Sequence, residues 1–256
     1  MKLYHNAPNL AVNSELGRFS IRTFRLVRVI KYWLRLLSLP QHRIVYTCYK
    51  FQFGEAEKSR SCWAHGVKQL LFSLGMGEAW LNQGVGNVTV FVNLFKQRCQ
   101  DIYIQEWQTS MSAFPKLDLY REFKSIFGRE KYFSVLTEEK FRNALCRFRV
   151  SAHSLRIESD RYLHNTRAER ICLYCNTNNV ENEFHFCLIC PFYTNFRVKY
   201  IPKYFYTPPS TDKFVKLLQS ENVSIIRNLS KFILYSTKKR SNAFVDTASV
   251  TVAINY

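Results

Sequence analysis

The sequence predicts a mainly α-helical protein, with a bundle-like helical region, a small cysteine-rich unit and C-terminal helices. Apolar residues recur at every third or fourth position through most of the 256 residues, which is the spacing of one helix face. Hydrophobic residues make up 47% of the chain and aromatic residues 16%, enough to build a core. Pro40 and Pro115 stand where two of the periodic segments end.

The first strongly periodic segment, residues 21–40, predicts a basic amphipathic helix. Its cations recur every three or four positions and therefore share one face: Arg25, Arg28, Lys31 and Arg35. The opposite face is apolar: Leu26, Ile30, Trp33 and Leu37. Such a helix can contact phosphates or lie on an anionic membrane surface, or its charges only keep a surface helix soluble.

The rest of the chain predicts further helices in order. They are expected over residues 61–80 with a break at Gly75 and Gly77, then over 88–114, 116–128, 137–157, 191–205, 213–220 and 223–240. Thr137 is the expected N-cap of its helix. In the long 88–114 helix the buried side is expected to hold Val92, Phe95, Cys99, Ile102 and Trp107.

These patterns suggest five parts. Residues 1–15 are an N-terminal extension, and 16–135 form a basic helical linker region. Residues 136–206 combine arginine-rich helices with the cysteine-rich unit, and 207–240 are C-terminal helices. Residues 241–256 lack helical periodicity, so we expect a disordered tail there.

The charge of the chain favours a polyanionic partner. The chain has 37 Lys and Arg against 19 Asp and Glu, a net charge of +18, and seven arginines fall between residues 142 and 170. Nucleic acid is the expected partner and a membrane is not. In addition to the four cations of the 21–40 helix, the candidate phosphate-binding residues are Arg147, Arg149, Arg156, Arg161, Arg167, Arg170 and Arg197.

The segment "CLYCNTNNVENEFHFCLICP", residues 172–191, has the composition of a metal site. Cys172, Cys175, His185 and Cys190 give the spacing C-x2-C-x9-H-x4-C, whose three sulfurs and one imidazole suit one structural zinc ion per chain. Cys187 and Cys190 also form a CxxC pair, so a four-cysteine site with His185 outside it fits the spacing as well. A third possibility is buried cysteines without a metal.

Other patterns argue against secretion and catalysis. There is no signal peptide and no apolar run of the ~18 residues that a membrane span needs, so we expect an intracellular protein of the nucleus or cytoplasm. Thiols stay reduced in these compartments, which favours metal binding over disulfides. The five aspartates are scattered and no phosphate-binding glycine loop occurs, so we expect neither an enzyme nor a small-molecule substrate.

The stretch "RICLYCNTNNVENEFHFCLICPFYTNFRVKYI" resembles the C-terminal zinc-binding segment of LINE-type (non-LTR) retrotransposon reverse transcriptases. The residues that match the family pattern are Cys172, Cys175, His185 and Cys190, followed by Pro191, Tyr193 and Arg197. The family usually carries an apolar residue at the position of Cys187, which favours His185 as the fourth ligand. Weaker likeness to the family's helical linker extends over most of residues 14–240.

The aspartate pair of the family's polymerase strand, F/Y-x-D-D, is missing from this sequence. The resemblance therefore implies the non-polymerase portion of such a protein, which would bind RNA or single-stranded DNA, with a polymerase as a possible partner in trans. Two alternatives stay open: an adaptor that binds proteins through its zinc unit, and a non-functional truncated remnant of a retroelement.

Overall fold

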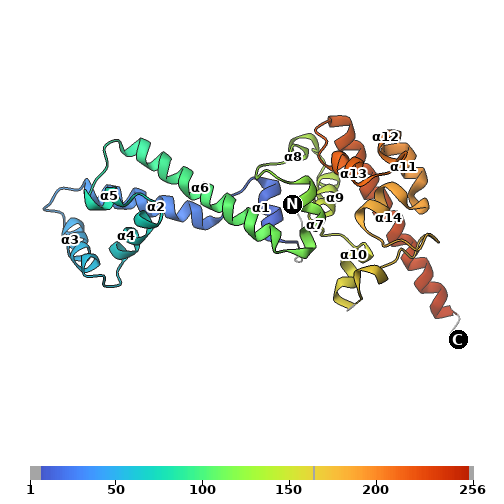
Figure 1. Ribbon diagram of the computed structural model, residues 1–256, viewed down its shortest axis with the longest axis horizontal. Helices are drawn as coiled ribbons and strands as arrows, with labels where there is room; N and C mark the ends of the chain where they lie inside the picture. The colour runs from blue at the N-terminus through green and yellow to red at the C-terminus, as the bar shows by residue number, and fades with distance from the viewer. Residues whose placement is uncertain (1–6, 164, 254–256) are drawn as a thin grey trace. The chain divides into compact units, whose positions relative to one another are not determined.

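The computed structural model describes residues 7–163 and 165–253, and the side chains of these residues up to position 243 (Figure 1). Helices of several lengths, joined by loops, make up this part of the chain. It contains no β-strand, only two isolated antiparallel bridges, Ile171–Val180 and Tyr206–Pro209. The prediction of a mainly α-helical protein is confirmed.

The chain divides into two units. Unit 1 combines Met1–Arg18 with Ser110–Tyr256, and unit 2 is Phe19–Thr109. Residues 7–18 therefore belong to the same unit as the C-terminal half. The predicted boundary at 135 falls inside unit 1, whereas the one at 15 lies close to the division after Arg18. A long-range ion pair of Glu15 with Arg149 holds the N-terminal segment in unit 1.

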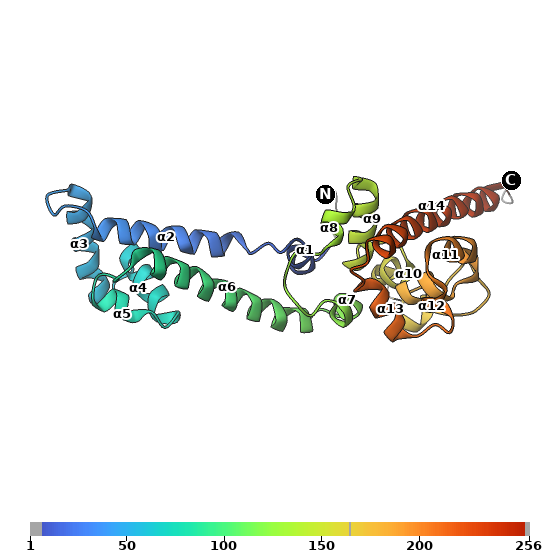
Figure 2. The same cartoon turned by 90° about the horizontal axis from the view of Figure 1, so that it is seen from above.

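Unit 2 is a helical bundle. Its helices are α2 (Ile21–Leu37), α3 (Ile44–Glu57), α4 (Trp63–Ser73), α5 (Gly77–Leu81) and most of α6 (Val88–Ser112). In both views, α2 and α6 run side by side in opposite directions, and α3 to α5 gather where α2 ends and α6 begins (Figures 1 and 2).

Aromatic side chains dominate the core of unit 2. Trp33 of α2 and Trp80 of α5 are fully buried and stack with their ring centroids 6.2 Å apart. The indole Nε1 of Trp33 donates a hydrogen bond of 2.9 Å to the hydroxyl of Tyr49 in α3, which satisfies a buried polar group. Phe95 of α6 is fully buried in the same core. The α6 residues predicted to be buried are buried or half-buried.

Unit 1 contains the remaining helices. They are α1 (Asn9–Leu16), α7 (Asp118–Phe123), α8 (Tyr132–Val135), α9 (Glu139–Arg149), α10 (Arg156–Ser159), α11 (Thr194–Tyr200), α12 (Lys203–Tyr206), α13 (Thr211–Leu218) and α14 (Val223–Ala253). Single turns of 3-10 helix cover Pro115–Leu117, Asp160–Leu163, Arg167–Glu169 and Pro191–Tyr193, and a π-helical turn covers His185–Ile189.

A row of aromatic rings joins α9, the π-helical turn and α14. The ring centroid of Phe186 lies 5.7 Å from that of Phe148 in α9 and 5.5 Å from that of Phe232 in α14. All three side chains are buried. This packing anchors the cysteine-rich segment, residues 171–190, to the main helices of unit 1.

Helices α9 and α14 differ from the predictions at their ends. Helix α9 begins at Glu139 without a side-chain cap, so Thr137 is not its N-cap, and it ends before Ser151, whose φ of 53° is left-handed. Helix α14 continues to Ala253, so the prediction of a disordered tail from residue 241 is wrong for 241–253, and residues 254–256 lie outside the described part of the chain.

Candidate metal centre

The first two cysteines lie on a short hairpin-like loop. The amide of Cys172 donates to the carbonyl of Asn179 over 2.9 Å, and the amide of Glu181 donates to the carbonyl of Arg170 over 2.8 Å. Asn178, with a left-handed φ of 52°, allows the chain to turn back on itself. Cys175 stands within this loop, so the CxxC pair presents both sulfurs from one turn.

The other two candidate ligands stand at the two ends of the π-helical turn. The side chain of Asn182 accepts a hydrogen bond of 2.8 Å from the amide of His185, which fixes the start of the turn. The amide of Cys190 donates to the carbonyl of His185 over 2.8 Å, the five-residue closure of a π-helix. The two ends of the turn thus bring the imidazole and the last thiol to the loop that carries Cys172 and Cys175.

The four candidate ligands converge. The ligand atoms of Cys172, Cys175, His185 and Cys190 all lie within 4.8 Å of one another. The Sγ atoms of Cys172 and Cys190 are 3.9 Å apart, and Nε2 of His185 is 3.3 Å from Sγ of Cys175. Tetrahedral coordination with metal–sulfur bonds of about 2.3 Å places sulfurs about 3.8 Å apart, so the donor set fits one metal ion.

Cys187 lies outside this group. Its side chain is fully buried, and burial raises the pKa of its thiol well above the ordinary value, so a thiolate is disfavoured there. The residues that could hold a metal ion in the described part of the chain are therefore three cysteines and one histidine, and the four-cysteine alternative does not match the geometry.

The contact between the thiols of Cys172 and Cys190 shifts the pKa values of both. The contact between Cys172 and Cys190 lowers the pKa of Cys172 and raises that of Cys190, because one proton between the two sulfurs stabilises the thiolate of Cys172. The nearby backbone amides of Tyr174 and Phe192 also lower the pKa values of Cys172 and Cys190, respectively. A cation held between the sulfurs would replace that shared proton.

Two side chains hold the site from outside, and sequence patterns did not point to this role. Arg197 is buried and donates to the carbonyls of Cys187 and Cys190 over 2.7 and 2.6 Å. Glu181 is fully buried and binds Arg240 of α14 through two hydrogen bonds of 2.8 Å. The acidic stretch "VENEF" before the histidine is the only sequence feature that points to a role for Glu181. Nothing in the sequence around Arg240 indicates that it contacts this site.

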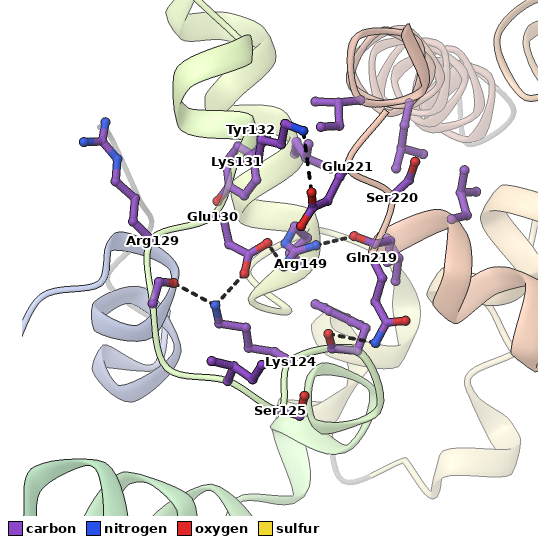
Figure 3. Close-up of a pocket in the computed structure, with 18 residues that line it drawn as sticks. Lys124, Ser125, Arg129, Glu130, Lys131, Tyr132, Arg149, Gln219, Ser220 and Glu221 are labelled. Atoms are coloured by element: carbon purple, nitrogen blue, oxygen red, sulfur yellow. Dashed lines mark hydrogen bonds and ion pairs between the residues drawn. The ribbon is translucent and has the colours of Figure 1, made fainter. Parts of the chain in front are cut away.

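Three arginines predicted to contact phosphates are instead part of the interior. Arg149 is 3% exposed, and its guanidinium binds Glu15 at 3.0 Å and Glu130 at 2.8 Å. Figure 3 shows this side chain pointing inward toward Glu130, between α9 and the loop before α8. Arg170 and Arg197 are also buried and donate to backbone carbonyls. For these three residues the prediction is wrong, because their charges are used within the fold.

The other arginines near the metal centre differ in availability. Arg156 binds Asp160 at 2.5 Å and Arg161 binds Glu158 at 2.8 Å, so both are neutralised within the chain. Arg147 is half-buried. Arg167 is exposed and lies 3.6 Å from Asp118. The arginine-rich segment therefore offers few free cations.

The four cations of the first amphipathic helix are where the sequence predicts them. Arg25, Arg28, Lys31 and Arg35 are all exposed on α2, and no ion pair involving them occurs among the described residues. The apolar side of the helix enters the core of unit 2 through Ile30 and the residues around it. This face is a basic surface that the protein itself does not neutralise.

No protein-family model, curated protein sequence or solved structure matches this chain. In addition, none of the described helices combines the length and the hydropathy required to span a membrane.

Proposed function

We propose that this chain is a non-catalytic, zinc-stabilised nucleic-acid-binding region related to the C-terminal part of LINE-type reverse transcriptases. Its ligand would be RNA or single-stranded DNA. The observation that carries the proposal is the row of four exposed, unpaired cations on α2, defined above as Arg25, Arg28, Lys31 and Arg35. With a net charge of +18, the chain has too few carboxylates to pair with all of its cations, so these four are free to bind an anionic partner.

Zinc is the ion that the donor set favours. Three thiolates and one imidazole in a closed, tetrahedral arrangement are typical of structural zinc sites, which bind no substrate. Cys172, His185 and Cys190 are buried and Cys175 is half-buried, and the four together would fill a tetrahedral sphere, so no position would stay open for a substrate. Zinc would contribute its binding free energy to the folding of the loop, since the ligands come from two separate turns.

Binding would be mainly electrostatic. Each cation that neutralises a phosphate releases a counterion, so the affinity falls as the salt concentration rises. For single strands, the logarithm of the binding constant falls against the logarithm of the salt concentration with a slope of about −0.7 per contact. Such contacts hold the protein on the sugar-phosphate backbone of the nucleic acid with little preference for base sequence.

A salt titration tests the proposal. Binding of a labelled single-stranded RNA to the zinc-loaded protein is measured by fluorescence anisotropy at increasing salt. The double substitution Arg28→Gln/Arg35→Gln is expected to make this slope less negative by about 1.4, because two phosphate contacts are lost. The matched control Lys58→Gln/Arg60→Gln removes the same charge, but these cations already bind Glu55, so the slope should stay unchanged. Absence of binding at low salt would refute the proposal.

A further inference from the structure

A small groove opens beside the basic face of α2. It has a volume of about 220 Å³ and lies wholly within unit 2, between α2, α3 and the start of α4. The side chains that line it are Tyr32, Leu36, Val45, Cys48, Tyr49, Gln52 and Trp63.

The walls of the groove are flat and apolar. Tyr32 is half exposed, and its ring meets that of Trp63 edge to face with the centroids 5.6 Å apart. Leu36 and Tyr49 are buried at its floor. Two of its polar groups already have partners: the hydroxyl of Tyr49 binds Trp33 and Gln83, and Oε1 of Gln52 accepts from the amide of Ala64. A ligand would therefore be held by stacking and apolar contact.

Cations flank this groove. Arg28 precedes Tyr32 by four residues and Arg35 follows it by three, so both lie on its side of α2, with Cβ atoms about 5–6 Å from that of Tyr32. The acid nearest in sequence to the lining residues, Glu55, is bound by Lys58 and Arg60. The surface thus combines an aromatic slot with positive charge along its α2 wall.

We propose that this groove receives an unpaired nucleobase of a single-stranded nucleic acid, while Arg28, Lys31 and Arg35 contact the flanking phosphates. The inference rests on the proposed function and specifies its ligand. A volume of 220 Å³ is smaller than the ~300–1,000 Å³ of sites for drug-sized ligands, so the groove fits one ring system. A base-paired duplex keeps its bases stacked inside and cannot supply that ring without unpairing.

Substitution of the aromatic wall tests the inference. Binding of oligothymidylate, and of the same strand paired with oligoadenylate, is measured by anisotropy at one low salt concentration. Tyr32→Ala is expected to weaken binding of the single strand by about five- to 150-fold, the range for loss of one stacked base, and to leave duplex binding unchanged. The matched control is Tyr204→Ala, which removes a tyrosine of similar exposure from unit 1.

A second measurement uses the unaltered protein, so it does not depend on the folding of a variant. Cys48 is an exposed free thiol on the wall of the groove. Bound oligothymidylate should slow its alkylation, followed by peptide mass spectrometry, whereas the half-buried thiol of Cys62 serves as an internal reference. The duplex should protect Cys48 less than the single strand does.

The outcomes separate the two proposals. Equal loss of single-strand and duplex affinity in Tyr32→Ala, or an alkylation rate of Cys48 that the single strand does not change, would overturn the groove assignment while binding to the basic face stands. If neither form of the oligonucleotide binds the wild-type protein, the proposed function fails, and the groove assignment fails with it.

Discussion

Arg240 on α14 and Glu181 beside the candidate metal centre form an ion pair with two hydrogen bonds of 2.8 Å each. Glu181 is fully buried, and its Oε2 also accepts from the amide of Arg156. The same guanidinium lies 5.1 Å from the ring centroid of Tyr174, which stands between the first two ligand cysteines. Burial alone would lower the pKa of Arg240, but the hydrogen bonds and charge of Glu181 raise it above the ordinary value. The pair therefore ties α14 to the loop that carries Cys172 and Cys175.

Arg240→Gln is expected to destabilise unit 1 by about 3–5 kcal/mol, because it leaves the buried carboxylate of Glu181 without its charged partner. Urea denaturation of the zinc-loaded protein, followed by circular dichroism, measures the change. Lys238→Gln removes an exposed cation from the same helix and should have little effect. Equal urea midpoints for the two variants would mean that the ion pair does not stabilise the fold.

The ion pair between Arg149 and Glu15 makes the N-terminal segment part of unit 1. Glu15 is fully buried and also accepts a hydrogen bond of 3.0 Å from the hydroxyl of Tyr120. Burial opposes the charge of Arg149, but Glu15 and Glu130 together raise its pKa above the ordinary value, so it stays charged. Glu15→Gln should therefore cost about 3–5 kcal/mol.

Hydrogen exchange can locate that loss. In Glu15→Gln we expect faster exchange in α1 and α9, whereas Glu122→Gln, an exposed acid of α7, should exchange like the wild type. Unchanged protection of α9 in the Glu15 variant would contradict a structural role for this pair.

Local patterns predicted part of this structure. The basic face of α2 and the cysteine cluster were predictable because helix periodicity and ligand spacing are properties of neighbouring residues. The burial of Arg149 was not, since its partner Glu15 is 134 residues away and an arginine gives no local sign of burial. The extension of α14 beyond residue 240 was also missed. A helix that packing has already started adds residues cooperatively, even where the sequence lacks periodicity.

Removal of the metal should affect one unit only. A chelator with a thiol reductant is expected to increase hydrogen exchange in residues 171–201, because the loop and the π-helical turn are joined through the ligands. All four tryptophans of the chain, Trp33, Trp63, Trp80 and Trp107, belong to unit 2. Tryptophan fluorescence should therefore stay constant during chelation. A change in it would contradict a metal effect confined to unit 1.

Two cysteine substitutions distinguish a ligand from a buried neighbour. Cys190→Ala should abolish zinc binding, whereas Cys187→Ala, three residues earlier and equally buried, should retain about one zinc per chain. Elemental analysis of protein purified without a chelator gives the zinc content. Loss of zinc in Cys187→Ala, with the fold intact by circular dichroism, would move the site to a different ligand set.

Glu57 at the end of α3 should make the stability of unit 2 depend on pH. Its carboxylate accepts a hydrogen bond of 2.9 Å from Nε1 of Trp80 and one of 3.1 Å from Lys68. The bond from Trp80 is the largest cause that lowers the pKa of Glu57 below its ordinary value of 4.5, followed by the bond from Lys68. The folded state therefore holds the carboxylate in its charged form more strongly than the unfolded chain does.

The sign of the pH effect follows from this shift. The contribution of Glu57 to the stability of unit 2 is fully present above the pKa that this carboxyl has in the unfolded chain. It is lost as the pH falls through its lower pKa in the folded state. The urea midpoint of unit 2, followed by tryptophan fluorescence, should therefore drop below about pH 4.5. Glu57→Gln should flatten this part of the profile, whereas Glu78→Gln, an exposed acid of α5, should leave it as in the wild type. A wild-type profile in both variants would assign the acid sensitivity of unit 2 to other carboxylates.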